Sequence, residues 1–122
     1  MTTVVISDSS SLILLYKVGV LELWMDCFKV IIPAAVFREC CGTAAQHHPD
    51  ARGIQQLAEQ RRVPVLKAKQ DEALRKKIGK WGDGETEMLL LFKQQKADYV
   101  VFAVDSTTAQ PSTATIFFTV AP

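Results

Sequence analysis

The chain has 122 residues, which suits one compact domain and leaves no room for two. Apolar residues make up 48% of it, a composition that excludes a disordered chain. The 14 Lys and Arg side chains nearly balance the 13 Asp and Glu side chains, which excludes a broad basic field. Any contact with nucleic acid must therefore come from a local patch.

Three cysteines, Cys27, Cys40 and Cys41, form an odd set without Cys-x-x-Cys spacing, and no secretory leader is recognisable. Reduced thiols in a cytoplasmic protein are the simplest interpretation. A zinc site built with His47 and His48 is an alternative, although its ligands would be irregularly spaced. No apolar run approaches the ~20 residues of a membrane helix, so we expect no membrane contact.

The first third of the chain alternates strands and helices. Residues 3–7 form a β-branched run that predicts a buried strand ending at Asp8. Serines at 9, 10 and 11 are favourable helix N-caps, and the helix that follows ends at Gly19. A second helix, a second strand and a third helix opened by Pro33 come next, at residues 21–28, 30–32 and 33–41.

The same alternation continues after a loop at residues 43–50. A helix, a strand weakened by Pro64 and a charged helix are predicted at residues 51–62, 63–66 and 71–78. A glycine-rich break leads to an apolar helix opened by Glu85, and residues 99–104 form the fourth strand. Strands that alternate with helices predict a parallel α/β sheet.

Two other segments stand out by their charge. Residues 61–80 are locally basic, and we interpret them as a solvated helix face and loop, with a nucleic-acid patch as the alternative. Residues 106–122 contain no charged residue, although the whole chain is 22% charged. We therefore divide the chain into a domain at residues 1–105 and an atypical segment at residues 106–122, which could form a loop and an edge strand.

Two acidic residues follow predicted strands. Asp8 comes directly after the first strand, and Asp105 takes the equivalent position after the fourth. Ligands of a parallel sheet bind outside the carboxyl ends of its strands, so both side chains are candidate site residues. The alternative for Asp8 is to cap the following helix, but the three serines make that role less necessary.

Two further carboxylates belong to predicted helices. Glu39 lies three residues after Val36, close to the apolar face, where a carboxylate needs a cation or a metal. The alternative is an ion pair with an arginine such as Arg38 or Arg52. Glu85 lies in the first turn of its helix, where a favourable interaction with the helix dipole is the alternative, and Asp83 or Glu87 could serve equally.

Converging carboxylates raise one another's pKa values and need a counter-charge. Mg²⁺ or Mn²⁺ would supply it, because these ions take hard oxygen ligands. A divalent ion held in this way can activate water for in-line attack on a phosphodiester. No Ser/His/Asp or Cys/His pair is needed for that reaction, and His47 and His48 lie in a polar segment that favours solvation.

Together these segments resemble the PIN-domain family, especially its small prokaryotic members related to VapC-type toxins. Residues 5–13 are similar to the family's first strand, its first acidic ligand and the serine two positions on. The likeness continues through residues 21–23 and 30–39, through Gly84-Glu85-Thr86-Glu87, and into the last strand at residues 97–101. It covers roughly residues 3–105, and its specificity lies in the ordered set.

The resemblance implies a three-layer α/β/α fold with a central parallel sheet. It also implies a divalent-metal-dependent ribonuclease, the toxin of a toxin–antitoxin pair, with Mg²⁺ or Mn²⁺ as cofactor and RNA as substrate. An antitoxin protein and a second copy of the chain, in a homodimer, are the implied partners. The catalytic and metal-binding roles fall on Asp8, Glu39, Glu85 and Asp105, with Glu87 as the alternative to Glu85 and Ser10 supporting Asp8 or a bound water.

The likeness ends near Asp105. The family closes this strand with an Asp pair or Asp-x-Asp, followed by an Arg-containing helix and a further strand, whereas Asp105 comes late and only uncharged residues follow. A change of reading frame near Phe102, compatible with Thr107-Thr108, is one explanation. The other is a truncated variant that completes its sheet by oligomerising, with residues 116–120 as an added strand. We therefore expect the last strand and helix to be missing or altered.

Two rival functions follow from the same residues. The first is a catalytically impaired PIN-like module that binds nucleic acid or protein, because the fourth acidic position is compromised. The second is a receiver-type signalling domain, which also places an Asp at its first strand end. That class requires a Lys at a later strand end, and no Lys follows Lys96.

Overall fold

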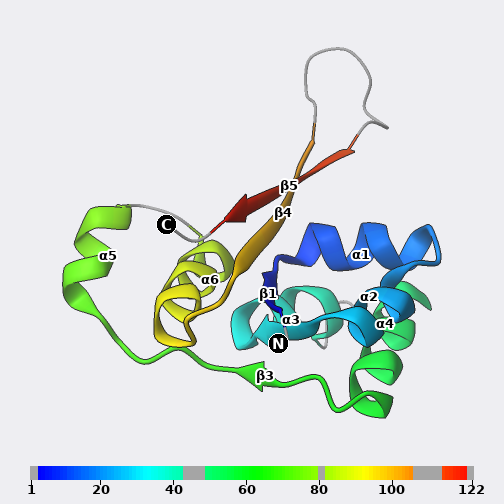
Figure 1. Cartoon of the computed structure of the whole chain (residues 1–122). Coiled ribbons are helices and arrows are strands. Elements are labelled where there is room, and N and C mark those ends of the chain that lie inside the picture. The colour runs from blue at the N-terminus through cyan, green and yellow to red at the C-terminus, as the bar shows by residue number, and fades with distance from the viewer. Residues whose placement is uncertain (1–2, 43–48, 80–81, 106–113, 121–122) are drawn as a thin grey trace.

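The structure is a computed structural model that describes residues 3–42, 49–79, 82–105 and 114–120 (Figure 1). Its strands are β1 (Val4–Ser7), β2 (Lys29–Pro33), β3 (Val65–Leu66), β4 (Tyr99–Asp105) and β5 (Ala114–Val120). Its helices are α1 (Ser9–Lys17), α2 (Leu21–Cys27), α3 (Ala34–Cys41), α4 (Pro49–Gln60), α5 (Glu72–Ile78) and α6 (Asp83–Gln94). The predicted alternation of strands and helices is confirmed.

The strands form one sheet in the order β3-β2-β1-β4-β5. The four strands from β3 to β4 are mutually parallel, as predicted, and β5 adds an antiparallel edge beside β4. From β1 the chain first builds the sheet toward β3 and then returns to place β4 on the other side of β1. The order thus reverses between β1 and β4, and the carboxyl ends of strands at such a reversal are where open α/β sheets bind ligands.

Helices cover both faces of the sheet. In Figure 1, α6 lies on one side of β1 and β4, and α1, α2 and α4 lie on the other, as right-handed crossovers require. Helix α3 follows β2 directly and contacts both α1 and α6, so it joins the two helical layers. This is the expected three-layer α/β/α fold. Within the described ranges, no helix is both long and apolar enough to cross a membrane.

The core is built from the strands and the helix stripes that face them. Successive residues Val5 and Ile6 of β1 are both buried, and so are Ile31 and Ile32 of β2. Consecutive buried side chains are characteristic of a parallel sheet covered on both faces, because neighbours along a strand point to opposite faces. Leu91 of α6 is also buried and belongs to the same core. Asp8 directly follows the buried strand β1, which places it at the edge of this core.

Several element boundaries differ from the sequence expectations. Pro33 does not begin a helix: with φ −60° and ψ 143° it is extended, ends β2 and precedes the first residue of α3. Helix α6 begins at Asp83, two residues before Glu85. Strand β3 is reduced to two residues, because Pro64 has no N–H to donate to a ladder.

The segment after β4 forms the edge strand that its apolar end suggested. Residues from Ala114 to Val120 pair with β4 along its whole length, from Asp105 back to Tyr99. The added strand therefore pairs within its own chain, so the sheet does not need a second copy to provide it. Thr107 and Thr108 lie outside the described residues, and the division of the chain at residue 105 stays a prediction.

One tight helix contact predicts a measurable cost. The ring of Tyr16 in α1 lies against Gly53 of α4, and a Cβ at Gly53 would come within 1.9 Å of Tyr16 Oη and 2.1 Å of its Cζ. Gly53→Ala is expected to lower the free energy of unfolding, because overpacking costs about 1–3 kcal/mol, more than the roughly 1 kcal/mol that alanine gains in helix propensity. Urea denaturation measures the change. The same substitution in a Tyr16→Ala background should not destabilise, and an equal loss in both backgrounds would contradict the contact.

Candidate metal centre

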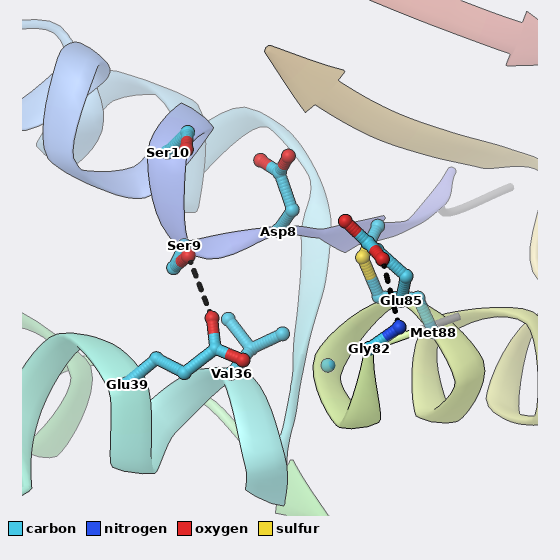
Figure 2. A pocket seen from close by; sticks show the side chains of 9 residues that line it. Asp8, Ser9, Ser10, Val36, Glu39, Gly82, Glu85 and Met88 are labelled. Atoms are coloured by element: carbon cyan, nitrogen blue, oxygen red, sulfur yellow. Dashed lines mark hydrogen bonds between the residues drawn. The ribbon is translucent and has the colours of Figure 1, made fainter. Parts of the chain in front are cut away.

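A pocket of about 160 Å³ opens at the carboxyl end of β1, beside the reversal of strand order (Figure 2). Three segments line it: the start of α1, the middle of α3 and the start of α6. Its lining residues are Asp8, Ser9, Ser10, Val36, Glu39, Gly82, Gly84, Glu85 and Met88. The pocket thus brings together three of the four predicted site carboxylates, each from a different element.

Asp8 is the N-cap of α1. Its Oδ1 accepts a hydrogen bond from Ser11 N at 2.8 Å, and its own N–H donates to Val101 O at 3.1 Å. The expectation that the serines make this cap less necessary was wrong, because the first helical residue is Ser9 and Asp8 directly precedes it. The two bonds fix Asp8 between β4 and α1, with its carboxylate at the pocket.

Glu39 reaches the pocket from an exposed turn of α3. Its Oε2 accepts a hydrogen bond from Ser9 Oγ at 3.0 Å, and among the described ion pairs it joins neither Arg38 nor Arg52. The start of α6 packs against it: a Cβ at Gly84 would come within 2.7 Å of Glu39 Oε1. The lack of a side chain at Gly84 therefore allows the start of α6 to lie close to Glu39.

The two candidate acidic residues of the Gly-Glu-x-Glu segment, Glu85 and Glu87, lie in different surroundings. Glu85 lines the pocket, and its Oε2 accepts a hydrogen bond from Gly82 N at 3.2 Å, as the third residue of a capped helix does. Glu87 points elsewhere: its Oε1 accepts from Ala35 N at 2.7 Å and its Oε2 from Ala68 N at 3.4 Å. Glu87 thus caps α3, whose N-cap Pro33 offers no side-chain hydrogen bond.

Asp105 does not take the position equivalent to Asp8. Ser7, the last residue of β1, pairs with Val101 of β4, and β4 continues for four residues beyond Val101. Asp8 itself lies one residue beyond Ser7, so Asp105 lies three residues past the equivalent position, about 10 Å at roughly 3.3 Å per residue. The strand runs on because β5 pairs with it throughout, and the backbone of Asp105 pairs with Ala114. The side chain of Asp105 lies outside the described part of the chain, so its role stays a prediction.

Ser9 is a site residue that the sequence reasoning missed. The prediction named Ser10, which lines the pocket with an exposed side chain, and its supporting role stays a prediction. The signal that the sequence offered was that Ser9 directly follows Asp8 at the start of a helix; its contact with Glu39, 30 positions away, appears only in the structure. Val36 and Met88 were also missed as lining residues, because only the packing of α3 against α6 brings them together.

The donor set of the pocket suits a hard divalent cation, because carboxylate oxygens are the ligands that Mg²⁺ and Mn²⁺ prefer. The described residues nevertheless contain no group of three His, Cys, Asp or Glu side chains already arranged as ligands of one ion. The hydrogen bonds to Glu39 and Glu85 each use one carboxylate oxygen, Oε2 in both. The residues therefore fit a metal by chemistry and location, and binding requires the carboxylates to turn toward one point.

Cys40, a buried thiol on α3 next to Glu39, has a raised pKa. Burial raises the pKa of Cys40 to about 12, and the charges of Cys41, Glu39 and Asp8 contribute in the same direction. Burial also raises the pKa of Cys41, whereas Cys27 is exposed. Both α3 thiols therefore stay protonated at neutral pH and are poor nucleophiles. His47 and His48, the other members of the alternative zinc site, lie outside the described residues.

This predicts selective alkylation. Iodoacetamide at pH 8 should modify Cys27 of the folded protein, while Cys40 and Cys41 react only after unfolding, because a buried thiol with a raised pKa has little thiolate. Peptide mass spectrometry before and after denaturation in urea counts the modified sites. Rapid modification of Cys40 in the folded state would contradict its burial.

Comparison with protein families identifies the class to which this fold and pocket belong. A family model described as a PIN domain matches residues 4–111. The chain belongs to the PIN-domain family, and its fold is of the nuclease type. PIN domains generally use divalent metals, in agreement with the carboxylates of the pocket. Comparisons with curated proteins and with solved structures gave no significant match.

Proposed function

We propose that the protein is a divalent-metal-dependent ribonuclease that acts as the toxin of a toxin–antitoxin pair. The observation that carries this proposal is the convergence of Asp8, Glu39 and Glu85 on one pocket at the reversal of strand order. Three local elements deliver three carboxylates to the edge where such sheets bind ligands. Helix starts gather at this edge of an α/β sheet, so capping alone would bring Asp8 and Glu85 there, but Glu39 lies inside α3 and has no capping role that explains its place in the pocket.

The proposed ligands of Mg²⁺ or Mn²⁺ are Asp8, Glu39 and Glu85, with Asp105 as a further candidate. The bound ion would activate water and stabilise charge at the phosphodiester. The chain's own residues prepare the site. The bonds to Ser11 and Val101 hold Asp8 at the end of β1, and Ser9 orients Glu39. Gly84 allows α6 to approach so closely that Glu85 faces the same space.

The proposed partners follow from the site and the family. RNA is the substrate, and an antitoxin segment laid over the acidic pocket would block access to it. A second copy of the chain would form a homodimer, and a cytoplasmic location suits a protein that acts on RNA. Ser10 is exposed and lines the pocket, and in this proposal it would orient Asp8 or a bound water.

The register of β4 favours a second candidate function. Asp105 lies four residues beyond the strand position that pairs with Ser7, and three acidic residues line the pocket among the side chains that the structure describes. A PIN-like module with a weakened metal site would bind RNA or protein without cutting it. Metal-dependent turnover distinguishes this module from the nuclease.

The test is cleavage of a mixture of end-labelled single-stranded and hairpin RNAs by the purified full chain. We expect discrete products with Mg²⁺ or Mn²⁺, no products with EDTA, and recovery when either ion is restored in excess. RNA bound but never cut in either metal would support the non-catalytic module. Cleavage that persists in EDTA would contradict the metal-dependent site.

A further inference from the structure

Helix α5 carries a compact group of cations. Arg75, Lys76 and Lys77 occupy its last turn, and all three side chains are exposed. The ion pairs among the described residues use other cations, namely Lys17, Arg61 and Lys93. A helix C-terminus carries only about half a negative charge. The three positive charges in the last turn of α5 are therefore more than interaction with the helix dipole explains.

Arg61, at the other end of the basic stretch at residues 61–80, forms ion pairs that link two helices. Arg61 donates a hydrogen bond to Asp26 at 2.9 Å and also pairs with Glu22, and these contacts raise its pKa. It thereby joins the end of α4 to α2. Among the described residues of this stretch, the three consecutive cations at the end of α5 form no such link between helices.

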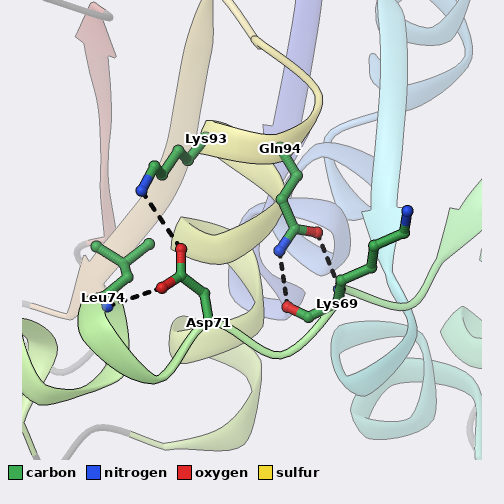
Figure 3. Close-up of polar contacts among 5 residues, drawn as sticks. All are labelled: Lys69, Asp71, Leu74, Lys93 and Gln94. Atoms are coloured by element: carbon green, nitrogen blue, oxygen red, sulfur yellow. Dashed lines mark hydrogen bonds and ion pairs between the residues drawn. The ribbon is translucent and has the colours of Figure 1, made fainter.

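A clamp of polar contacts fixes the start of α5 on α6 (Figure 3). Asp71 caps α5 by accepting from Leu74 N at 3.0 Å, and its second oxygen pairs with Lys93 Nζ at 3.3 Å. Gln94 accepts from Lys69 N at 2.9 Å and donates to Lys69 O at 2.7 Å. The Leu74 N–H and Lys93 together hold the pKa of Asp71 below its usual value, so the clamp is charged at neutral pH.

The far end of α5 leads directly to the acidic pocket. Gly79 ends the helix, and Gly82, three positions later, lines the pocket. Three residues of extended chain span at most about 11 Å. The basic turn is therefore held near the pocket by the short connection to Gly82, while the clamp fixes the other end of α5 on the body of α6.

We propose that Arg75, Lys76 and Lys77 bind the phosphates of the RNA strand and hold it beside the pocket of Asp8, Glu39 and Glu85. This inference rests on the proposed function. An acidic pocket repels a polyanion, and a net charge of +1 supplies no attractive field from the rest of the chain. A substrate with a phosphate backbone therefore needs a local group of cations close to the site, and α5 provides one.

The test is RNA binding measured by fluorescence anisotropy with a labelled single-stranded 12-nucleotide RNA in EDTA, which prevents cleavage. Arg75→Gln, Lys76→Gln and Lys77→Gln are combined in one variant. Three lost phosphate contacts should lower the slope of log affinity against log salt by about 2, and weaken binding about 100-fold at 0.1 M salt. The matched control combines Lys29→Gln, Arg52→Gln and Arg62→Gln, three exposed cations outside α5, and should bind almost as tightly as the wild type.

The outcomes separate this inference from the proposed function. Equal loss in both triple variants, or no loss in the α5 variant, would overturn the role of α5 and point to an acidic protein segment as its partner. RNA binding that depends on α5 in a protein that never cuts RNA would support the inference while refuting the nuclease. If both hold, the α5 variant should show a raised KM for cleavage and an unchanged kcat.

Discussion

Asp8→Asn is expected to reduce RNA cleavage by at least about 100-fold while leaving the protein as stable as the wild type. Groups that merely support metal ligands are worth roughly 10–100-fold in affinity or activity, so loss of a ligand charge should cost more. Asparagine caps helices about as well as aspartate does, so the bond to Ser11 N can be kept. Initial cleavage rates in Mn²⁺ and urea denaturation of the same preparation measure the two effects.

Asp8→Ala is the matched comparison. It removes the cap as well as the charge, so its free energy of unfolding should fall by about 1 kcal/mol. Its activity should be as low as that of Asp8→Asn. If Asp8→Asn cleaved RNA at the wild-type rate, Asp8 would be a helix cap alone and would have no place in the mechanism.

Glu87→Gln is expected to have the opposite profile, with a large loss of stability and little loss of activity per folded molecule. Its carboxylate accepts hydrogen bonds from Ala35 N and Ala68 N, the first at the start of α3. An amide in its place turns an NH₂ donor toward a backbone donor and removes a negative charge from a helix N-terminus. Leaving a buried donor unsatisfied costs about 1–3 kcal/mol. Urea denaturation and cleavage rates scaled to folded protein measure the result.

Glu85→Gln is the control two residues away on the same helix. Glu85 is exposed and bonds only Gly82 N among the described residues, so its loss should change stability little and abolish cleavage. Glu85→Gln is thus expected to lose activity and keep stability, and Glu87→Gln to lose stability and keep activity. Loss of activity in Glu87→Gln together with full activity in Glu85→Gln would move the third acidic role to Glu87 and refute the geometry of the pocket.

The sequence predicted the fold well because its apolar strands are short, continuous and bounded by clear breaks. The runs that contain Val5 and Ile6, and Ile31 and Ile32, can satisfy their burial only in a sheet covered on both faces. The order of strands and helices then restricts the topology to a parallel α/β sheet. Predicted element boundaries were wrong where the conformation of a single residue sets them. Pro33 was expected to begin a helix, but it is extended and ends β2.

The site was predictable only in part, because side-chain roles depend on contacts between distant segments. The end of the first strand indicated Asp8, and the resemblance to PIN domains indicated Glu39 and Glu85. Neither could distinguish Glu85 from Glu87, since the partner that occupies Glu87 is the start of α3, 52 positions away in the sequence. The position of Asp105 was misjudged because strand register depends on pairing with β1 and β5.

Locating the binding site of a divalent ion tests the proposed metal centre most directly. Mn²⁺ added in small amounts to isotope-labelled protein broadens the NMR signals of nearby amides. We expect the signals of Ser9, Ser10 and Gly84 to disappear first and those of Val4 and Lys29, which pair at the opposite end of the sheet, to persist. Glu85→Gln should weaken the effect. Broadening that is absent, or that centres on another acidic residue such as Asp26, would contradict a metal centre formed by Asp8, Glu39 and Glu85.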